Sequence, residues 1–210
     1  MLAEELETVR IEEHPYLIRV YGISEEEYSR ITNEDTKYEL VDGVLVMHSP
    51  ATLPHEELFG FLSFLLTGFV RRRGLGKVYG SRATLHLGTR RNLEPDILFV
   101  ATRNIHLVHR RSVEQTADLV VEILSESTRE YDLDEKRHLY QQAGVGEIWL
   151  LDPDAREVIV DSRRDIGYSE TRYRDGRLDS GAVGGFWLDV SWLWRDPLPD
   201  PLTCLEQILG

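Results

Sequence analysis

Residues Asp118–Lys136 read DLVVEILSESTREYDLDEK, and the rest of the chain can be arranged around this stretch. Its first part, Leu119–Leu124, is an apolar run rich in β-branched residues, which predicts a strand buried on both faces of a covered sheet. Glu122 interrupts the run. An unpaired carboxylate inside a protein costs several kcal/mol, so Glu122 must be protonated, ion-paired or metal-bound.

The helix predicted from Asp132 to Ala143 has the opposite irregularity, a lysine on its apolar face. At about 100° per residue, with Asp132 as the N-cap, Lys136 falls in the middle of the apolar arc. A lysine at the edge of the arc would extend its ammonium to water, whereas the central position favours burial. The chain has only three lysines, which makes this placement informative. The arc consists of Leu133, Leu139, Tyr140 and Ala143.

Length and charge restrict the class of protein. At 210 residues the chain suits one domain with a sizeable core. A formal net charge of −13 argues against a protein that coats nucleic acid or binds an anionic membrane, but it permits an enzyme that holds nucleic acid through a local basic patch and a metal. The single cysteine, Cys204, fits a reducing compartment, and no apolar run is long enough to span a bilayer. We therefore expect a cytoplasmic protein with no membrane segment.

The remaining pattern predicts an α/β fold, a mixed sheet flanked by helices. We expect residues 1–23 to form an N-terminal arm, residues 24–195 a single domain, and residues 196–210 a C-terminal tail. A Ser24–Glu27 capping box predicts a short helix, and Asp42-Gly43 predicts a hairpin turn. The other expected elements are a helix from Pro54 to Arg73, strands at 77–79, 83–87, 94–101, 147–151, 157–160, 168–173 and 186–190, a loop at 88–93, and a loop or short helix at 102–117.

Two further carboxylates lie in predicted strands. Asp96 begins the apolar run EPDILFVA, where an aspartate often bonds to local backbone, and Glu39 lies in a hairpin strand whose alternate residues can face solvent. Neither is informative alone. Carboxylates that converge would need a cation, and oxygen ligands without Cys or His suit Mg²⁺ or Mn²⁺. With a lysine to orient water or to stabilise charge on a phosphate, this is the chemistry of phosphodiester hydrolysis.

Five segments of the chain form a recognisable set. They are YELVDG (38–43), PDILFV (95–100), DLVVEILSEST (118–128), YDLDEKRHLY (131–140) and GVGEIWLLD (144–152). With these segments in this order, the chain between Ser24 and Val160 closely resembles the Uma-two family of restriction-endonuclease-like proteins, which is placed in the PD-(D/E)XK nuclease superfamily. The resemblance implies a restriction-endonuclease-like mixed sheet flanked by helices, with extra β-hairpins, often as a homodimer.

The resemblance also implies roles. Pro95-Asp96 matches the PD element of the superfamily motif. Glu122 matches the second acidic residue of that motif, and Glu39 matches an additional acidic residue on its N-terminal side. Leu124 occupies the position of the superfamily's usual lysine, and Lys136 matches a lysine that this family carries on the following helix.

Two other positions also bear on the resemblance. His55 matches a histidine near the start of the long helix, where a supporting role behind the ligands and a capping role are both open. Glu126 stands where the family often has proline, which puts the local turn in question.

We expect a Mg²⁺-dependent DNA endonuclease in which Asp96, Glu122, Glu39 and the carbonyl of Ile123 bind the metal and Lys136 positions the nucleophilic water. A catalytically inactive binding or assembly module of the same fold is an alternative that the net charge favours. A metal-dependent phosphoesterase on another substrate is a second alternative. The arginines at 71–73 also suit the negative end of a helix dipole. The expected DNA contacts are Arg71, Arg72, Arg73, Arg82, Arg90 and Arg91.

Overall fold

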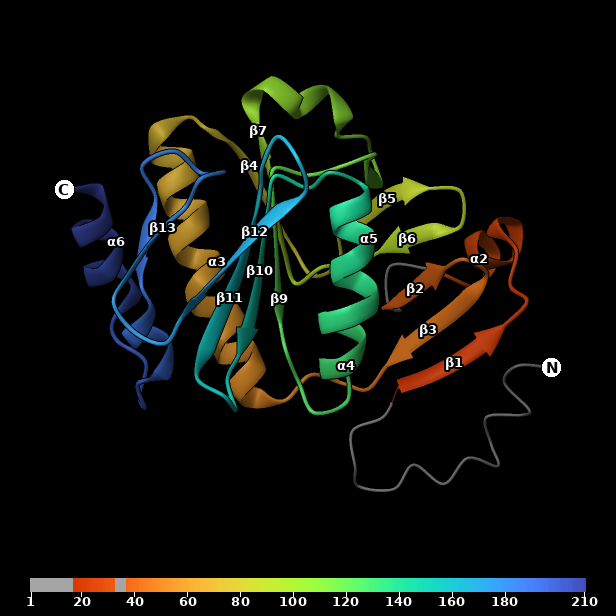
Figure 1. The fold of residues 1–210 in the computed structure, drawn as a ribbon, viewed down its shortest axis with the longest axis horizontal. Helices are drawn as coiled ribbons and strands as arrows, with labels where there is room; N and C mark the ends of the chain where they lie inside the picture. Colours follow the sequence, from red (N-terminus) through yellow and green to blue (C-terminus); the bar gives the residue numbers. More distant parts are fainter. Residues whose placement is uncertain (1–16, 33–36) are drawn as a thin grey trace.

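The central sheet is built around the strand that contains Glu122. The chain is seen here in a computed structural model, which describes residues 17–32 and 37–210. Strand β9 (Leu119–Ile123) runs parallel to β10 (Glu147–Asp152) and antiparallel to β7 (Ile97–Ala101), and all three are buried along their length (Figure 1). The strand order is β12-β11-β10-β9-β7-β4. The outer strands are β4 (Gly76–Gly80), β11 (Glu157–Arg163) and β12 (Tyr168–Tyr173).

A second six-stranded sheet carries Glu39 and has the order β1-β3-β2-β6-β5-β8. The predicted hairpin is confirmed, and Asp42 and Gly43 both have positive φ, at 49° and 90°, as a tight two-residue turn requires. One expectation is wrong, because the loop predicted at 88–93 contains strand β6. Within the expected N-terminal arm, residues 1–16 lie outside the described residues, and Leu17–Tyr21 forms β1, which pairs with β3. The bounds are β1 (Leu17–Tyr21), β2 (Tyr38–Val41), β3 (Val44–His48), β5 (Thr84–Gly88), β6 (Arg91–Leu93) and β8 (Ser112–Glu114).

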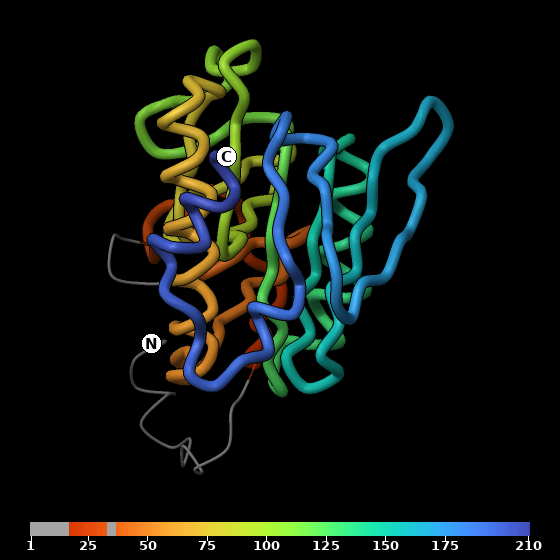
Figure 2. The backbone as a smooth tube through the Cα atoms, turned by 90° about the vertical axis from the view of Figure 1, so that its left-hand side faces the viewer, coloured from red at the N-terminus to blue at the C-terminus, as the bar shows by residue number. Residues whose placement is uncertain are grey.

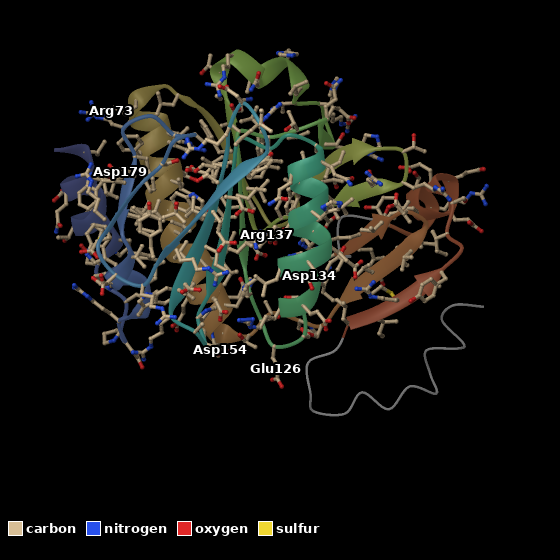
Figure 3. All side chains as sticks on the ribbon, viewed as in Figure 1. Arg73, Glu126, Asp134, Arg137, Asp154 and Asp179 are labelled. Atoms are coloured by element: carbon tan, nitrogen blue, oxygen red, sulfur yellow. The ribbon has the colours of Figure 1, made fainter. Side chains whose placement is uncertain are left out.

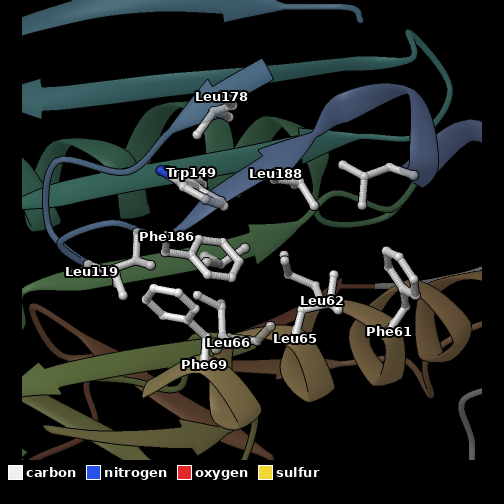
Figure 4. Close-up of a cluster of buried hydrophobic side chains, with 14 of the residues drawn as sticks. Phe61, Leu62, Leu65, Leu66, Phe69, Leu119, Trp149, Leu178, Phe186 and Leu188 are labelled. Carbon is white, nitrogen blue, oxygen red and sulfur yellow. The ribbon is translucent and has the colours of Figure 1, made fainter. Parts of the chain in front are cut away.

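Helix α3 (Leu53–Arg73) covers one face of the central sheet, and α6 (Pro201–Leu209) packs on it (Figure 2). A Cβ on Gly68 would lie 2.5 Å from Leu205 Cδ2, so the glycine permits the close approach of the two helices. The expected C-terminal tail therefore includes a helix that contributes to the core. Figure 4 shows the apolar side chains between α3 and the strands, with Trp149 and Phe186 among the largest. The small sheet on this side pairs β13 (Arg177–Asp179) with β14 (Trp187–Asp189).

The opposite face is covered by a helical stretch that lies between the two sheets. It consists of α4 (Arg129–Tyr131), a π-helical turn η2 (Asp132–Lys136) and α5 (Arg137–Gln142). The prediction of Asp132 as the N-cap is wrong, because its N–H already donates to Thr128 O at 2.8 Å and the helix has begun at Arg129.

The remaining helices are short. The Ser24–Glu27 capping box is confirmed at the start of α2 (Glu25–Ile31). Two 3₁₀ helices, η1 (Thr102–Leu107) and η3 (Val190–Trp194), complete the described fold. None of the described helices is both long and apolar enough to cross a lipid bilayer.

Candidate active site

Lys136 lies at the centre of a cluster of buried carboxylates, with its side chain only 2% exposed. Its Nζ is 2.7 Å from Glu122 Oε1, 3.1 Å from Glu39 Oε1 and 3.4 Å from Asp132 Oδ1. Tyr140 donates a hydrogen bond of 2.5 Å to Glu122 Oε1. Burial opposes the charge on Lys136, but the carboxylates of Glu122 and Glu39 outweigh it and raise the pKa of the lysine well above its usual value. The ammonium is therefore charged.

The π-helical turn shapes the helical side of this cluster. π-Helical turns occur as short insertions in α-helices, often at functional sites. Here the turn carries Asp132 and Lys136 to the buried side, while Asp134 and Glu135 face solvent. The burial predicted for Lys136 is confirmed. Asp132 was not predicted as a member of the cluster, although its i, i+4 spacing from Lys136 places the two on one face of a helix.

Glu39 connects the second sheet to this cluster. Its Oε1 accepts a hydrogen bond of 2.7 Å from Glu94 N, and its Oε2 lies 3.0 Å from His48 Nε2. Burial would raise the pKa of Glu39, but the charge of Lys136 and the contact with His48 lower it below its usual range. Burial and the neighbouring Glu39 charge raise the pKa of Glu94 to about 7. Glu39 is therefore the ionised partner of Lys136.

Asp96 occupies a neighbouring position with its own cations. Because Ile97 pairs with Val121, the strand register places Asp96 opposite Glu122, and Asp96 Oδ2 accepts a hydrogen bond of 2.8 Å from Ile123 N. Lys37 Nζ is 3.1 Å from Oδ1, and His55 Nε2 is 3.2 Å from Oδ2. Burial opposes ionisation of Asp96, yet Lys37 and His55 lower its pKa below the usual range. Burial also opposes charging of His55, but its hydrogen bond to Asp96 raises its pKa.

A cavity of about 140 Å³ joins these groups. Asp96, Glu122 and Lys136 line it together with two loops, residues 48–52 and 125–128. Glu126 is exposed at the outer edge of the second loop (Figure 3), and the turn still closes through a hydrogen bond from Thr128 N to Ser125 O of 3.2 Å. The substitution of glutamate for the family's proline therefore leaves the turn intact.

The acidic side chains of this cavity offer carboxylate oxygens, the type of ligand that a hard divalent cation prefers. Burial and the nearby carboxylates of Asp132, Asp96 and Glu39 raise the pKa of Glu122 to about 8, in spite of the adjacent lysine. Asp132 Oδ1 has no hydrogen-bond partner among the described residues. Both observations mark a local excess of negative charge. Among the described residues, however, no three His, Cys, Asp or Glu side chains gather as a ready metal site, and lysines lie beside the carboxylates of Asp96 and Glu122.

The predicted arginines lie apart from this cavity. Arg73, at the end of α3 opposite to His55, donates to Leu209 O at 2.7 Å (Figure 3). Arg91 is paired with Asp42 at 2.8 Å. Arg82 lines a different cavity. The structure thus brings Lys136 into contact with Glu39 and Glu122, with Asp96, Ile123 and His55 alongside, and none of the predicted arginines lines the cavity.

Comparison with known proteins gives one family and one fold. The model of the Uma2 family, described as "Putative restriction endonuclease", matches residues 25–191. A solved structure from Anabaena variabilis, described as "a putative nuclease belonging to DUF820", is similar with a TM-score of 0.68 and 16% identity, covering 82% of this chain and 97% of that one. At this identity the likeness supports the fold alone. No curated protein matches the chain.

Proposed function

The chain belongs to the Uma2 family, and from that premise we propose that it is a metal-dependent DNA endonuclease that hydrolyses phosphodiester bonds. One observation carries the proposal. Two strands and a helix from distant parts of the sequence place Glu39, Glu122 and Lys136 in direct contact, next to Asp96 and a common cavity. Buried charges at this density are costly, so their clustering supports a catalytic role. The DNA substrate and a homodimeric assembly remain predictions.

Asp96, Glu122 and the carbonyl of Ile123 would hold Mg²⁺ or Mn²⁺, as such oxygen ligands suit a hard cation. When bound, the metal would supply polarisation of a phosphoryl oxygen and a lowered pKa of bound water. The charged Lys136 would orient the attacking water and stabilise charge that develops on the phosphate.

Neighbouring residues position these groups. Glu39 holds the ammonium of Lys136 from the second sheet at 3.1 Å. Tyr140 donates to Glu122, and His55 contacts Asp96, so each proposed acidic ligand has a partner that fixes its orientation.

Cleavage assays test this site. Duplex, nicked and single-stranded DNA would be incubated with Mg²⁺ or Mn²⁺ and the wild-type, Asp96→Asn or Lys136→Met protein. We expect each variant to lose at least about a hundredfold in rate, the scale of removing one transition-state contact. Asp179→Asn is the matched control, because this exposed aspartate on β13 pairs only with Arg177 among the described residues. Cleavage that is equal in all four proteins would refute the site assignment.

A catalytically inactive binding module is the second candidate, favoured by one observation. Among the described residues the carboxylates are paired with lysines and do not form a ready group of metal ligands. The two candidates differ in their response to metal. An endonuclease should gain thermal stability with Mg²⁺ or Mn²⁺ in the wild-type protein but not in Asp96→Asn, because a ligand stabilises only the state that binds it. An inactive module should gain in neither.

A further inference from the structure

A second and larger cavity, of about 490 Å³, lies beside the turn between β4 and β5. Residues 79–83 form one wall, residues 108–113 form another, and Phe59 of α3 contributes an aromatic ring. We refer to it as the arginine groove, after its polar members. Its charged and aromatic lining residues are Phe59, Tyr79, Arg82, His109, Arg110 and Arg111.

The groove is basic in an acidic protein. The chain contains 37 acidic residues and a net charge of −13, yet no Asp or Glu is among the residues that line the groove. Arg110 and Arg111 are exposed, and neither takes part in an ion pair within the described residues. By contrast, Arg91 and Arg137 are held by carboxylates. Because no carboxylate lines the groove, Arg110 and Arg111 form a site for an anionic ligand.

The groove adjoins the candidate active site. In the pairing of β4 with β7, Gly80 lies opposite Ile97, the residue that follows Asp96. On α3, Phe59 is one turn from His55, whose Nε2 is 3.2 Å from Asp96 Oδ2. An anionic chain bound in the groove would therefore continue toward Asp96.

We propose that the arginine groove binds a short single-stranded segment of nucleic acid through its phosphates, next to the cavity that contains Asp96. A positive groove with aromatic side chains is the usual arrangement for single strands. Its volume is that of a pocket for a small organic ligand, which suits one or two nucleotides and is too small for a double helix. The inference rests on the proposed function for the identity of the ligand, but its test does not require cleavage.

Fluorescence anisotropy in EDTA measures binding without catalysis. The probe is a labelled oligothymidylate, and the variants are Arg110→Ala/Arg111→Ala and the matched pair Arg164→Ala/Arg195→Ala. Arg164 and Arg195 are also exposed and without an ion pair among the described residues, and Arg164 lies at the edge of the central sheet opposite to β4. We expect the Arg110→Ala/Arg111→Ala variant to bind the oligonucleotide about tenfold or more weakly than the wild-type protein. The slope of log K against log salt concentration should become less negative by about 1.4, at about 0.7 for each phosphate that an arginine no longer neutralises. The control pair should change neither value.

Several outcomes would overturn the groove assignment. They are no binding of the oligonucleotide by the wild-type protein, equal losses in both double variants, equal binding of duplex and single strand, and competition by thymidine monophosphate or inorganic phosphate as effective as by the oligonucleotide. The proposed function fails separately. A protein that binds the strand through Arg110 and Arg111 but cleaves no DNA would support the groove assignment and refute the endonuclease proposal. A protein that cleaves DNA but does not bind the strand through these arginines would refute the groove assignment and leave the endonuclease proposal standing.

Discussion

Glu122 and Glu147 lie on neighbouring parallel strands and are each about 2% exposed, yet their surroundings differ. Glu147 accepts hydrogen bonds from Ser180 Oγ at 2.6 Å, Gly181 N at 3.1 Å and Ala182 N at 3.3 Å, all from one loop. Glu122 forms an ion pair with Lys136, which is also paired with Glu39 and Asp132, and Glu122 lines a cavity. A buried carboxylate with its own donors stabilises the fold, whereas one that shares a single cation retains capacity for a ligand.

The largest effect that separates the two regions should come from Lys136→Ala. Without the ammonium, Glu39, Glu122 and Asp132 would face one another in a buried site, and breaking a buried ion pair by removing one partner costs about 3–5 kcal/mol. Urea unfolding of the metal-free protein would measure this loss of unfolding free energy.

The control for this experiment is the double variant Glu122→Gln/Lys136→Met. It removes a negative charge together with the positive one, so we expect it to recover part of the lost stability. A double variant that is no more stable than Lys136→Met alone, which keeps a side chain of similar length, would show that the unpaired charge of Glu122 does not cause the loss.

The second effect should come from Glu147→Ala. The substitution leaves Ser180 Oγ and the N–H groups of Gly181 and Ala182 without their acceptor, which should lower the unfolding free energy by about 2–3 kcal/mol. Cleavage per folded molecule should not change, because Glu147 lies outside the cavity that Glu122 lines. A selective loss of the cleavage rate, with stability retained, would contradict the structural role assigned to Glu147.

The same pair of residues shows how far sequence reasoning reaches. Glu122 lies within an apolar run and Glu147 begins one, so burial could be inferred for either. The loop that donates hydrogen bonds to Glu147 comes more than thirty residues later, and no local sequence pattern predicts it. Lys136 was predicted to be buried because helical spacing is a local property. Its contacts with Glu39 and Glu122 depend on the packing of two sheets, which no local pattern encodes.

Misassigned elements have a similar cause. Asp132 was interpreted as a helix cap because Asp is common there, but the helix starts earlier, at Arg129, and the residue turns inward. Strand β6 was missed because Arg91 and Asn92 are polar, and their place in the sheet depends on backbone pairing with β2 and β5. The predicted DNA contacts stay a prediction, since exposed arginines carry no local sign of what they face.

A third effect concerns pH in the metal-free protein. Burial raises the folded-state pKa of Glu122 to about 8 from 4.5, so the folded state retains a proton that the unfolded chain loses between those values. This contribution to stability is complete below pH 4.5 and is lost as pH rises through about 8. Glu122→Gln should therefore be nearly as stable as wild type at low pH and more stable by about 2 kcal/mol at about pH 6, and the difference should increase further toward pH 8.

Chemical unfolding of both proteins between about pH 5 and about pH 8.5 would measure this difference, since the range spans most of the interval between the two pKa values. Glu147→Gln is the matched control, since it makes the same substitution on the adjacent strand. A difference between wild type and Glu122→Gln that does not vary with pH would show that Glu122 does not titrate in this range.

The smallest effect should come from Arg103→Ala, at the opposite end of β9 from Glu122. Asp118 pairs with Arg103, but it also accepts from Ala101 N at 2.7 Å and from Asn104 Nδ2 at 3.1 Å, and the Arg103 side chain is 70% exposed. An exposed partner of an already satisfied carboxylate contributes little, so the unfolding free energy should fall by less than about 1 kcal/mol. If thermal unfolding showed a loss as large as that of Lys136→Ala, the number of donors around a buried carboxylate would not distinguish structural from functional sites. A small loss would support the use of the number of hydrogen-bond donors to identify Glu122, and not Asp118, as the carboxylate with capacity to bind a ligand.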